Sequence, residues 1–375
     1  MSMRIFFICS VIFLSPLALA HGDSYDITKS PAYPVGHIDI EDVTASPWDI
    51  SLIESTGVLM VTSVGTNLGE KNGKIWKANP NDSKFNEVTI KSEESQNYYA
   101  LSSHVYEPLS KRMFACSNTA ETRYYNPPKN TPEIVYPSVV VFELSSDGSF
   151  VWVGSTSFLD KPGQHCGGVT IVNGIVFATN QYATDTSYPA LYAADISSGI
   201  IPSTMSVVQS YSDLGYTAEK TIANHDLITS VRAKRTQVEN VWSLYLLDSG
   251  RTRILEVAFD KEKDSNAIKR LGDIKLLSLP NEIKVPIALY NYDDSRFFLS
   301  ADIVSVYSIR YDEEGNPEIS WKAQAPSLVT GLAVAPEGTS QEKETNATKV
   351  LLTTSPVLVE GKYQISKFAL PDQYK

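Results

Sequence analysis

The segment QHCGGVTIVNGIVFATNQ, residues 164–181, contains two short apolar runs separated by Asn173-Gly174. An Asn-Gly pair between two such runs is among the strongest short-range signals for a β-hairpin. We therefore expect residues 167–172 and 175–180 to form two antiparallel strands joined by a tight turn.

The same hairpin pattern occurs six times along the chain. The second runs, each with Ser, Thr, Asn or Asp near its end, are LMVTSV (59–64), MFACSN (113–118), IVFATN (175–180), YLLDSG (245–250), FFLSAD (297–302) and VLLTTS (350–355). First runs precede them at 47–53, 100–106, 167–172, 225–231, 285–292 and 329–335, and third runs follow at 74–79, 138–144, 190–196, 253–259, 305–311 and 363–370. We interpret the Asp, Asn and Gly residues after the second strands as ordinary turn chemistry.

Strands of this length without helical periodicity predict an antiparallel all-β fold. Because radial repetition of four-stranded sheets leaves few exposed edges, we expect a six-bladed β-propeller with four-stranded antiparallel blades. Fourth strands are expected at 150–158 and 205–212, and HIDIED (37–42) is expected to pair with the last blade. A pair of β-sandwiches is the alternative.

The chain has 375 residues and a formal net charge of -11. This acidic balance argues against nucleic acid and an anionic membrane surface as partners. Residues 21–375 are expected to form a single monomeric domain, with the loops 119–136 and 184–189 covering one mouth of its channel.

Residues 1–20 have the pattern of a secretory signal peptide. Arg4 supplies the positive charge, residues 5–14 form the apolar run, and Ala18-Leu19-Ala20 is a small-residue cleavage site. No later stretch reaches the roughly 20 apolar residues of a membrane helix. We therefore expect a protein that is secreted or resides in the lumen of the secretory pathway.

Two features agree with that compartment. Asn81 and Asn346 each begin an Asn-x-Ser/Thr glycosylation acceptor pattern. Cys9 is lost with the signal peptide, so Cys116 and Cys166 remain, and we expect them to form a disulfide between adjacent blades. Two buried free thiols are the alternative.

Three segments carry a family resemblance: SPWDISLIESTGVLMVTSV (46–64), CGGVTIVNGIVFATN (166–180) and HDLITSV (225–231). They resemble the first-, third- and fourth-blade segments of the six-bladed superfamily of senescence-marker/gluconolactonase, strictosidine-synthase-like and paraoxonase proteins. Hydrolases of that superfamily hold a divalent metal with Glu, Asn and Asp.

This chain departs from the metal-binding pattern. It has Ala45 or Ser46 where the Glu would stand, His165 or Cys166 where an Asn would stand, and only Asp226 or Asn224 as a ligand on blade 4. Because Ca²⁺ takes six or more oxygen ligands, we expect no metal site and no cofactor.

Histidines are the remaining candidates for chemistry. His104, His165 and His225 lie in or at the head of the predicted innermost strands of three successive blades. We expect them, with Asp226, to border the central cavity, and at least one of them to transfer a proton. Structural histidines that bond to neighbouring blades are the alternative, and a three-histidine metal site is disfavoured because the strand frames differ.

Aromatic and polar residues near the same mouth are expected to bind an apolar substrate, with packing between blades as the alternative. They are Trp48, Asn224, Tyr124, Tyr125, Tyr182 and Tyr188. Arg232 and Arg251 are interpreted as solvated or rim charges, and the sequence has no G-x-S-x-G nucleophile elbow.

The signal peptide, glycosylation patterns, propeller repeat and missing metal ligands together resemble the secreted fungal propeller hetero-Diels–Alderases of tropolone–sesquiterpenoid pathways. That resemblance implies an enzyme of secondary metabolism for small apolar or aromatic natural products. It would dehydrate an alcohol to a quinone methide and add this to a sesquiterpene. The alternatives are a divalent-metal lactonase or esterase of the gluconolactonase type, and a non-catalytic secreted binding propeller.

Overall fold

The computed structural model describes residues 31–65, 72–91, 98–118, 136–159, 164–183, 185–217, 227–236, 238, 241–261, 268–293, 295–336 and 349–374. The described residues from 32 onward form one compact unit. The predicted signal peptide therefore lies outside the described residues. No helix within the described ranges is long and apolar enough to cross a membrane.

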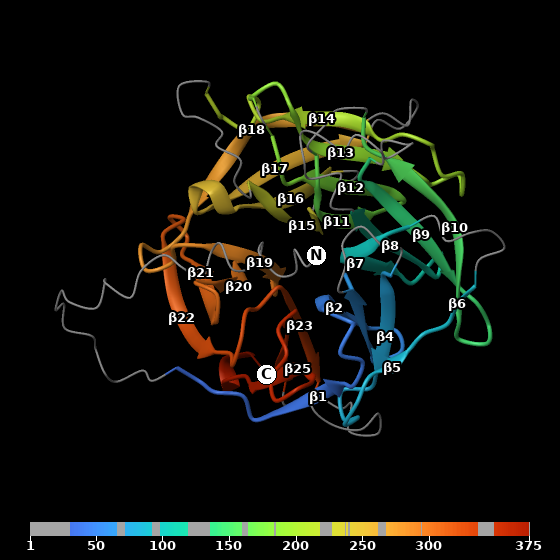
Figure 1. The fold of residues 1–375 in the computed structure, drawn as a ribbon. Helices are drawn as coiled ribbons and strands as arrows, with labels where there is room; N and C mark the ends of the chain where they lie inside the picture. Colours follow the sequence, from blue (N-terminus) through green and yellow to red (C-terminus); the bar gives the residue numbers. More distant parts are fainter. Residues whose placement is uncertain are drawn as a thin grey trace, which may run out of the picture. The chain divides into compact units, whose positions relative to one another are not determined.

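The predicted fold class is confirmed: six antiparallel sheets surround one axis, with β2, β7, β11, β15, β19 and β23 innermost (Figure 1). Blade 1 contains β2 (Pro47–Ile53), β3 (Val58–Ser63), β4 (Lys74–Ala78) and β5 (Asn86–Glu87). Blade 2 contains β7 (Ala100–Glu107), β8 (Arg112–Asn118), β9 (Ser138–Leu144) and β10 (Phe150–Ser157), with β6 (Ile90–Lys91) added in parallel to β10. Blade 3 contains β11 (Cys166–Val172), β12 (Ile175–Asn180), β13 (Pro189–Asp195) and β14 (Ser206–Ser210).

The second half of the ring follows the same order. Blade 4 contains β15 (Ile228–Arg235), β16 (Val241–Asp248), β17 (Arg253–Lys261) and β18 (Ile268–Ser278). Blade 5 contains β19 (Pro286–Asn291), β20 (Arg296–Ala301), β21 (Ser305–Tyr311) and β22 (Pro317–Gln324). Blade 6 contains β23 (Gly331–Pro336), β24 (Lys349–Thr354), β25 (Tyr363–Ala369) and β1 (Gly36–Ile40). The 3₁₀ turns Ser249–Arg251 and Asp372–Tyr374 are the helical segments described.

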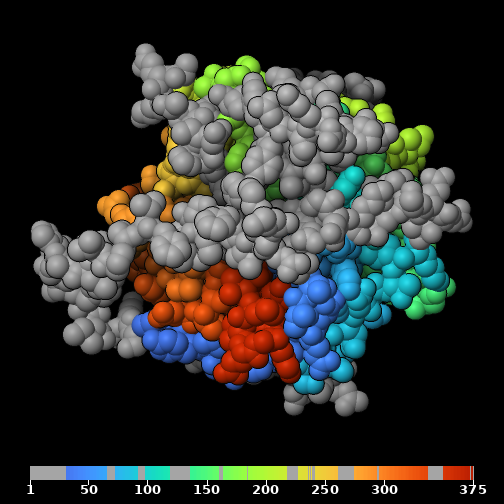
Figure 2. All heavy atoms as spheres, in the orientation of Figure 1, coloured from blue at the N-terminus to red at the C-terminus, as the bar shows by residue number. Residues whose placement is uncertain are grey.

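Blade 6 closes the ring with strands from both ends of the chain. β1 pairs antiparallel with β25, in a register that sets His37 opposite Ser366 and Asp39 opposite Gln364. Lys362 also donates to the Asp39 carboxylate across 2.9 Å. The predicted pairing of residues 37–42 with the last blade is thus confirmed, and Figure 2 shows blade 6 (red) between blade 5 (orange) and blade 1 (blue).

Each pair of neighbouring blades shares its own apolar cluster. Phe177 of blade 3 packs with Val231 and Trp242 of blade 4, and five further clusters occupy the other five interfaces. The alternating apolar residues of every strand therefore serve two interfaces, because successive side chains point to opposite faces of the blade. This arrangement explains why the sequence repeat is one of alternation.

The innermost strands of blades 1 to 5 carry a β-bulge near their first residues. The register shifts lie between Pro47 and Asp49, Leu101 and His104, Cys166 and Gly168, Ile228 and Ser230, and Pro286 and Ala288. A bulge leaves an extra residue outside the strand ladder. Its carbonyl is then available to a neighbouring blade.

Side chains at or next to the ends of the second strands donate to backbone carbonyls at the head of the next innermost strand, and we call each such bond an interblade latch. The accepting carbonyls of Trp48 and Ser102 belong to bulged residues. The described latches run from Thr354 to the carbonyl of Trp48 (2.9 Å), Thr62 to Ser102 (2.5 Å), Asn118 to Cys166 (3.0 Å), Ser249 to Pro286, and Ser300 to Val329 (3.1 Å). Between blades 3 and 4 the backbone N–H of Leu227 donates to the carbonyl of Gln181 across 3.0 Å. For Asn118 the interpretation as ordinary turn chemistry was wrong, because its side chain joins blade 2 to blade 3.

The predicted disulfide is confirmed. Cys116 in β8 and Cys166 in β11 are bonded, with their Cα atoms 5.5 Å apart and both side chains fully buried. The disulfide lies beside the Asn118 latch. Oδ1 of Asn118 also accepts the backbone N–H of Cys166 across 2.9 Å. Blades 2 and 3 are therefore held covalently and by two hydrogen bonds at the same edge.

The innermost strands approach each other too closely for side chains at some positions. A Cβ at Gly168 in β11 would lie 2.8 Å from the backbone nitrogen of Val231 in β15. Close contact of this kind requires glycine, because backbone atoms cannot move aside as the end of a side chain can.

Gly168→Ala should therefore lower the free energy of unfolding by about 1–3 kcal/mol through overpacking. Gly36→Ala in β1 is the matched control, because its added Cβ would meet no atom within 4 Å. Chemical denaturation of both variants tests this. Equal midpoints for the two would contradict the proposed close approach.

Candidate functional site

His104 lies in the interface between blades 1 and 2. Alternation along β2 places Asp49 and Ser51 on the same face of blade 1, and both side chains contact His104 of β7. The His104 side chain has no exposed surface, whereas Ser51 is half-buried. The pair therefore connects a buried imidazole to a partly accessible hydroxyl.

Hydrogen bonds around His104 define its tautomer. Thr62 donates its hydroxyl proton to the carbonyl of Ser102, so its oxygen accepts a hydrogen bond from Nδ1 of His104 across 3.0 Å. With the proton on Nδ1, Nε2 is an acceptor, and Ser51 Oγ donates to it across 2.7 Å. This assignment follows from the hydrogen-bond network.

Asp49 holds the backbone next to His104 in place and supplies a negative charge near the imidazole. Its Oδ2 accepts the backbone N–H of His104 across 3.0 Å and lies 3.7 Å from Nδ1, while Oδ1 accepts the N–H of Ile50 across 2.9 Å. A carboxylate on the Nδ1 side favours the Nδ1–H tautomer and stabilises an imidazolium.

The His104 imidazole is held in its neutral form. Burial lowers the pKa of His104, Asp49 acts in the opposite direction, and the positive charge of Arg232 lowers the pKa further. Near neutral pH the group is therefore a base with an unprotonated Nε2.

His165 lies at the head of β11 and is half-buried. Its backbone N–H donates to Oδ1 of Asn180 across 3.1 Å, and Nδ1 lies 3.0 Å from Oε1 of Gln181. The edge of one ring faces the other between His165 and Tyr182, with centroids 5.8 Å apart. Its predicted place at the cavity remains a prediction.

Other predicted site residues are distributed differently. Trp48 is half-buried, and its carbonyl accepts the hydroxyl protons of Thr330 and Thr354. Tyr188 is buried in the apolar cluster between blades 3 and 4, as in the packing alternative. Asn81 lies in an exposed turn after β4. Six predicted residues lie outside the described residues: Tyr124, Tyr125, Asn224, His225, Asp226 and Asn346.

The two arginines interpreted as solvated or rim charges have specific surroundings. Arg251 stacks on the ring of Tyr216 at 3.7 Å and donates to the carbonyl of Gly215 across 3.0 Å. Arg232 on β15 is half-buried, and its charge acts on both His104 and Tyr290. Arg251 thus binds the segment that contains Gly215 and Tyr216. The positive charge of Arg232 lowers the pKa of His104.

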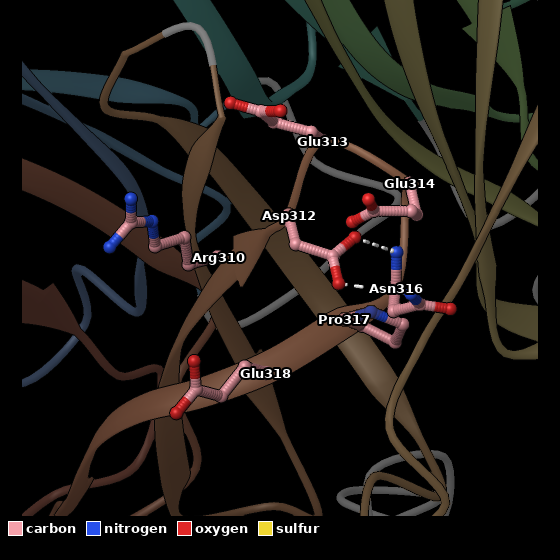
Figure 3. Close-up of a pocket in the computed structure, with 7 residues that line it drawn as sticks. All are labelled: Arg310, Asp312, Glu313, Glu314, Asn316, Pro317 and Glu318. Carbon is pink, nitrogen blue, oxygen red and sulfur yellow. Dashed lines mark hydrogen bonds between the residues drawn. The ribbon is translucent and has the colours of Figure 1, made fainter.

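A hollow of about 400 Å³ lies at the hairpin between β21 and β22 (Figure 3). Asp312 accepts the N–H and Nδ2–H of Asn316 there, at 2.6 and 2.9 Å, and these bonds lower the pKa of Asp312. The contacts are those of a tight turn. Among the described residues, no group of three or more His, Cys, Asp or Glu side chains is placed to hold a metal ion.

The Ser51–His104 pair was missed in the sequence because 53 residues and one blade boundary separate its members. The available signal was the spacing of Asp49 and Ser51, two residues apart on a predicted innermost strand. That spacing predicts a shared face, but it does not predict which residue of the next blade meets that face.

Neither a protein-family model nor a curated protein sequence matches this chain. Among solved structures it is similar to Sqt1 of Saccharomyces cerevisiae, with 10% identity, a TM-score of 0.44, and coverage of 91% of this chain and 100% of that one. The SapL1 lectin in complex with alpha methyl fucoside gives 8% identity, a TM-score of 0.46, and coverage of 88% and 98%.

A third similar structure is the alpha-L-arabinofuranosidase Arb93A from Fusarium graminearum in complex with an iminosugar inhibitor. It gives 10% identity, a TM-score of 0.47, and coverage of 91% of this chain and 98% of that one. At this level of similarity none of the three carries an argument about the present chain.

The buried His104 predicts a pH dependence of stability. In the unfolded chain a histidine takes up a proton below about pH 6.5. The folded protein takes it up only at lower pH, because burial lowers the His104 pKa. The stabilisation is therefore complete above about pH 6.5 and is lost as pH falls towards the folded pKa, by at most about 1.4 kcal/mol per pH unit.

Denaturant unfolding of the wild type and His104→Asn between about pH 7.5 and about pH 5 tests this dependence. The wild type should lose more stability on acidification than His104→Asn, which lacks the titrating group. The charged groups acting on His104, Asp49 from β2 and Arg232 from β15, are the same in both proteins. His37→Asn, which alters a half-exposed histidine, is the control. Equal slopes for the wild type and His104→Asn would show that burial of His104 does not have this effect.

Proposed function

We propose that this protein is an enzyme that transforms small, apolar, hydroxylated molecules by general acid–base catalysis, with His104 as the base. The supporting observation is the 2.7 Å hydrogen bond from Ser51 Oγ to Nε2 of His104. A neutral imidazole that already accepts a hydrogen bond from the hydroxyl of a half-buried serine is suited to proton transfer near neutral pH.

Proton transfer would run through Ser51. A substrate hydroxyl bound beside Ser51 gives its proton to Oγ, and the Ser51 proton passes to Nε2 of His104. The Asp49 carboxylate, 3.7 Å from Nδ1, stabilises the resulting imidazolium. His165, His225 and Asp226 remain the candidates for the acid that protonates a leaving hydroxyl.

The reaction we propose is dehydration of a benzylic-type alcohol on a phenol or tropolone ring. The ring hydroxyl loses a proton to the base, the leaving hydroxyl gains one, and water departs to leave a quinone methide. The quinone methide then adds to a sesquiterpene alkene in a hetero-Diels–Alder reaction, which needs orientation in a dry site and no further group from the protein. Support for this reaction is the resemblance of the sequence to the fungal propeller hetero-Diels–Alderases.

We also propose that residues 1–20 are removed as a signal peptide and that the protein is secreted as a glycosylated monomer. The Cys116–Cys166 disulfide supports an oxidising compartment. The exposed turn at Asn81 is accessible to glycosylation, and Asn346 is the second proposed acceptor.

The function is tested by incubating the protein with hydroxybenzyl or hydroxymethyl-tropolone alcohols and a humulene-type sesquiterpene, with adducts measured by liquid chromatography and mass spectrometry. His104→Asn keeps an N–H donor for Thr62 but removes Nε2, so adduct formation should fall about 10²–10⁴-fold. His37→Asn should retain the wild-type rate.

Folding of each variant is checked by circular dichroism. A folded His104→Asn protein with the full rate would remove His104 from the mechanism. A wild-type protein that forms no adduct with any of these alcohols would contradict the proposed reaction.

A further inference from the structure

Ser51, His104 and Asp49 form a second type of catalytic arrangement, one that acts on acyl groups. We propose that Ser51 is an activated nucleophile and that the protein hydrolyses small carboxylic esters through an acyl-serine intermediate. This activity goes beyond the proposed dehydration and uses the same base.

The geometry contains the parts that a serine nucleophile requires. The hydroxyl of Ser51 donates to Nε2 of His104 at 2.7 Å, which is the distance expected between nucleophile and base. On the other side of the ring, Nδ1 donates to Thr62 at 3.0 Å and lies 3.7 Å from the Asp49 carboxylate. The Thr62 hydroxyl thus orients the imidazole, as the third group of a triad orients its histidine, and the Asp49 carboxylate supplies a nearby negative charge.

This environment differs from that of other serines in the described residues. Ser149 donates to the Asp147 carboxylate and Ser300 donates to the carbonyl of Val329, and these acceptors are poor bases at neutral pH. Ser51 instead donates to a neutral imidazole. Ser51 is also half-buried and lies on an innermost strand, whereas the ring that activates it is fully buried.

The proposed reaction proceeds in two balanced steps. Ser51 Oγ attacks the ester carbonyl while Nε2 of His104 takes its proton, and this proton then passes to the departing alkoxide as the ester C–O bond breaks. Water next attacks the acyl-serine, His104 takes a proton from the water and returns it to Ser51 Oγ, and the carboxylic acid leaves. The sum is one ester and one water giving one acid and one alcohol.

Charges around the pair suit these steps. Asp49 lies on the Nδ1 side and stabilises the imidazolium that forms when Ser51 attacks. Arg232, from β15 of blade 4, supplies a positive charge that acts on His104. This charge lowers the His104 pKa and so keeps the imidazole in the neutral form that accepts the Ser51 proton.

A fluorophosphonate probe tests the nucleophile directly on the full-length protein. Attack by Ser51 expels fluoride and leaves a stable phosphonyl-serine, which intact-mass measurement counts and peptide mapping locates. We expect one label per chain on Ser51, formed about 10²-fold more slowly in His104→Asn and absent from that site in Ser51→Ala. Ser320→Ala is the matched control, because Ser320 is a half-buried serine of blade 5 whose hydroxyl bonds to Ser308 and Tyr374.

Release of nitrophenolate from p-nitrophenyl acetate gives an independent readout, and Ser51→Ala should abolish any release above the buffer rate. No label on Ser51, labelling that is equally fast in His104→Asn, or labelling only at other residues would overturn the nucleophile. Peptide mapping of the wild-type protein does not depend on whether a variant folds, and the labelling rate of His104→Asn is compared only after circular dichroism shows that it is folded. Labelling of Ser51 without adduct formation would contradict only the dehydration reaction, whereas adduct formation without labelling would contradict only the nucleophile.

Discussion

The interblade latch is the interaction on which the ring depends. Side chains at the ends of second strands, such as Thr62 and Asn118, donate to carbonyls that begin the innermost strand of the next blade. Bulges in two of those strands expose the carbonyls of Trp48 and Ser102, and an apolar cluster lies in each interface. Because buried backbone groups need partners, bulge and latch stabilise each other. One hydrogen bond contributes only about 0.5–1.5 kcal/mol, but the ring repeats it around its axis.

The candidate site includes one of these latches, that of Thr62. Thr62 joins blade 1 to the carbonyl of Ser102, and the same oxygen accepts Nδ1–H of His104. A bond that holds two blades together thereby fixes the tautomer of an imidazole and directs its basic nitrogen at Ser51. The chemistry we propose therefore needs little beyond the fold: one histidine on β7, and a serine and an aspartate on β2.

The sequence predicted the local features of the fold well. Alternation, Asn173-Gly174 and the repeat indicated strands, hairpins and six blades, and the disulfide followed from the positions of Cys116 and Cys166 on adjacent blades. The latches were not predicted, because Asn and Ser after a strand also suit a turn, and only the bulge register shows that they reach another blade. The partner of Ser51 was missed for the same reason, since its contact depends on how two sheets are placed side by side.

Closure by β1 and β25 has a consequence for the order of folding. The sixth sheet is complete only when residues 36–40 pair with residues 363–369. β1 is synthesised early, but it cannot pair until β25 has been synthesised near the other end of the chain. Such a long-range contact carries a large loop-closure entropy and slows folding. Until it forms, blade 6 has only β23, β24 and β25, and the outer edge of β25 is unpaired. A chain emerging from synthesis is thus exposed to pairing of this edge with other copies, and removal of residues 36–40 would leave the edge open permanently.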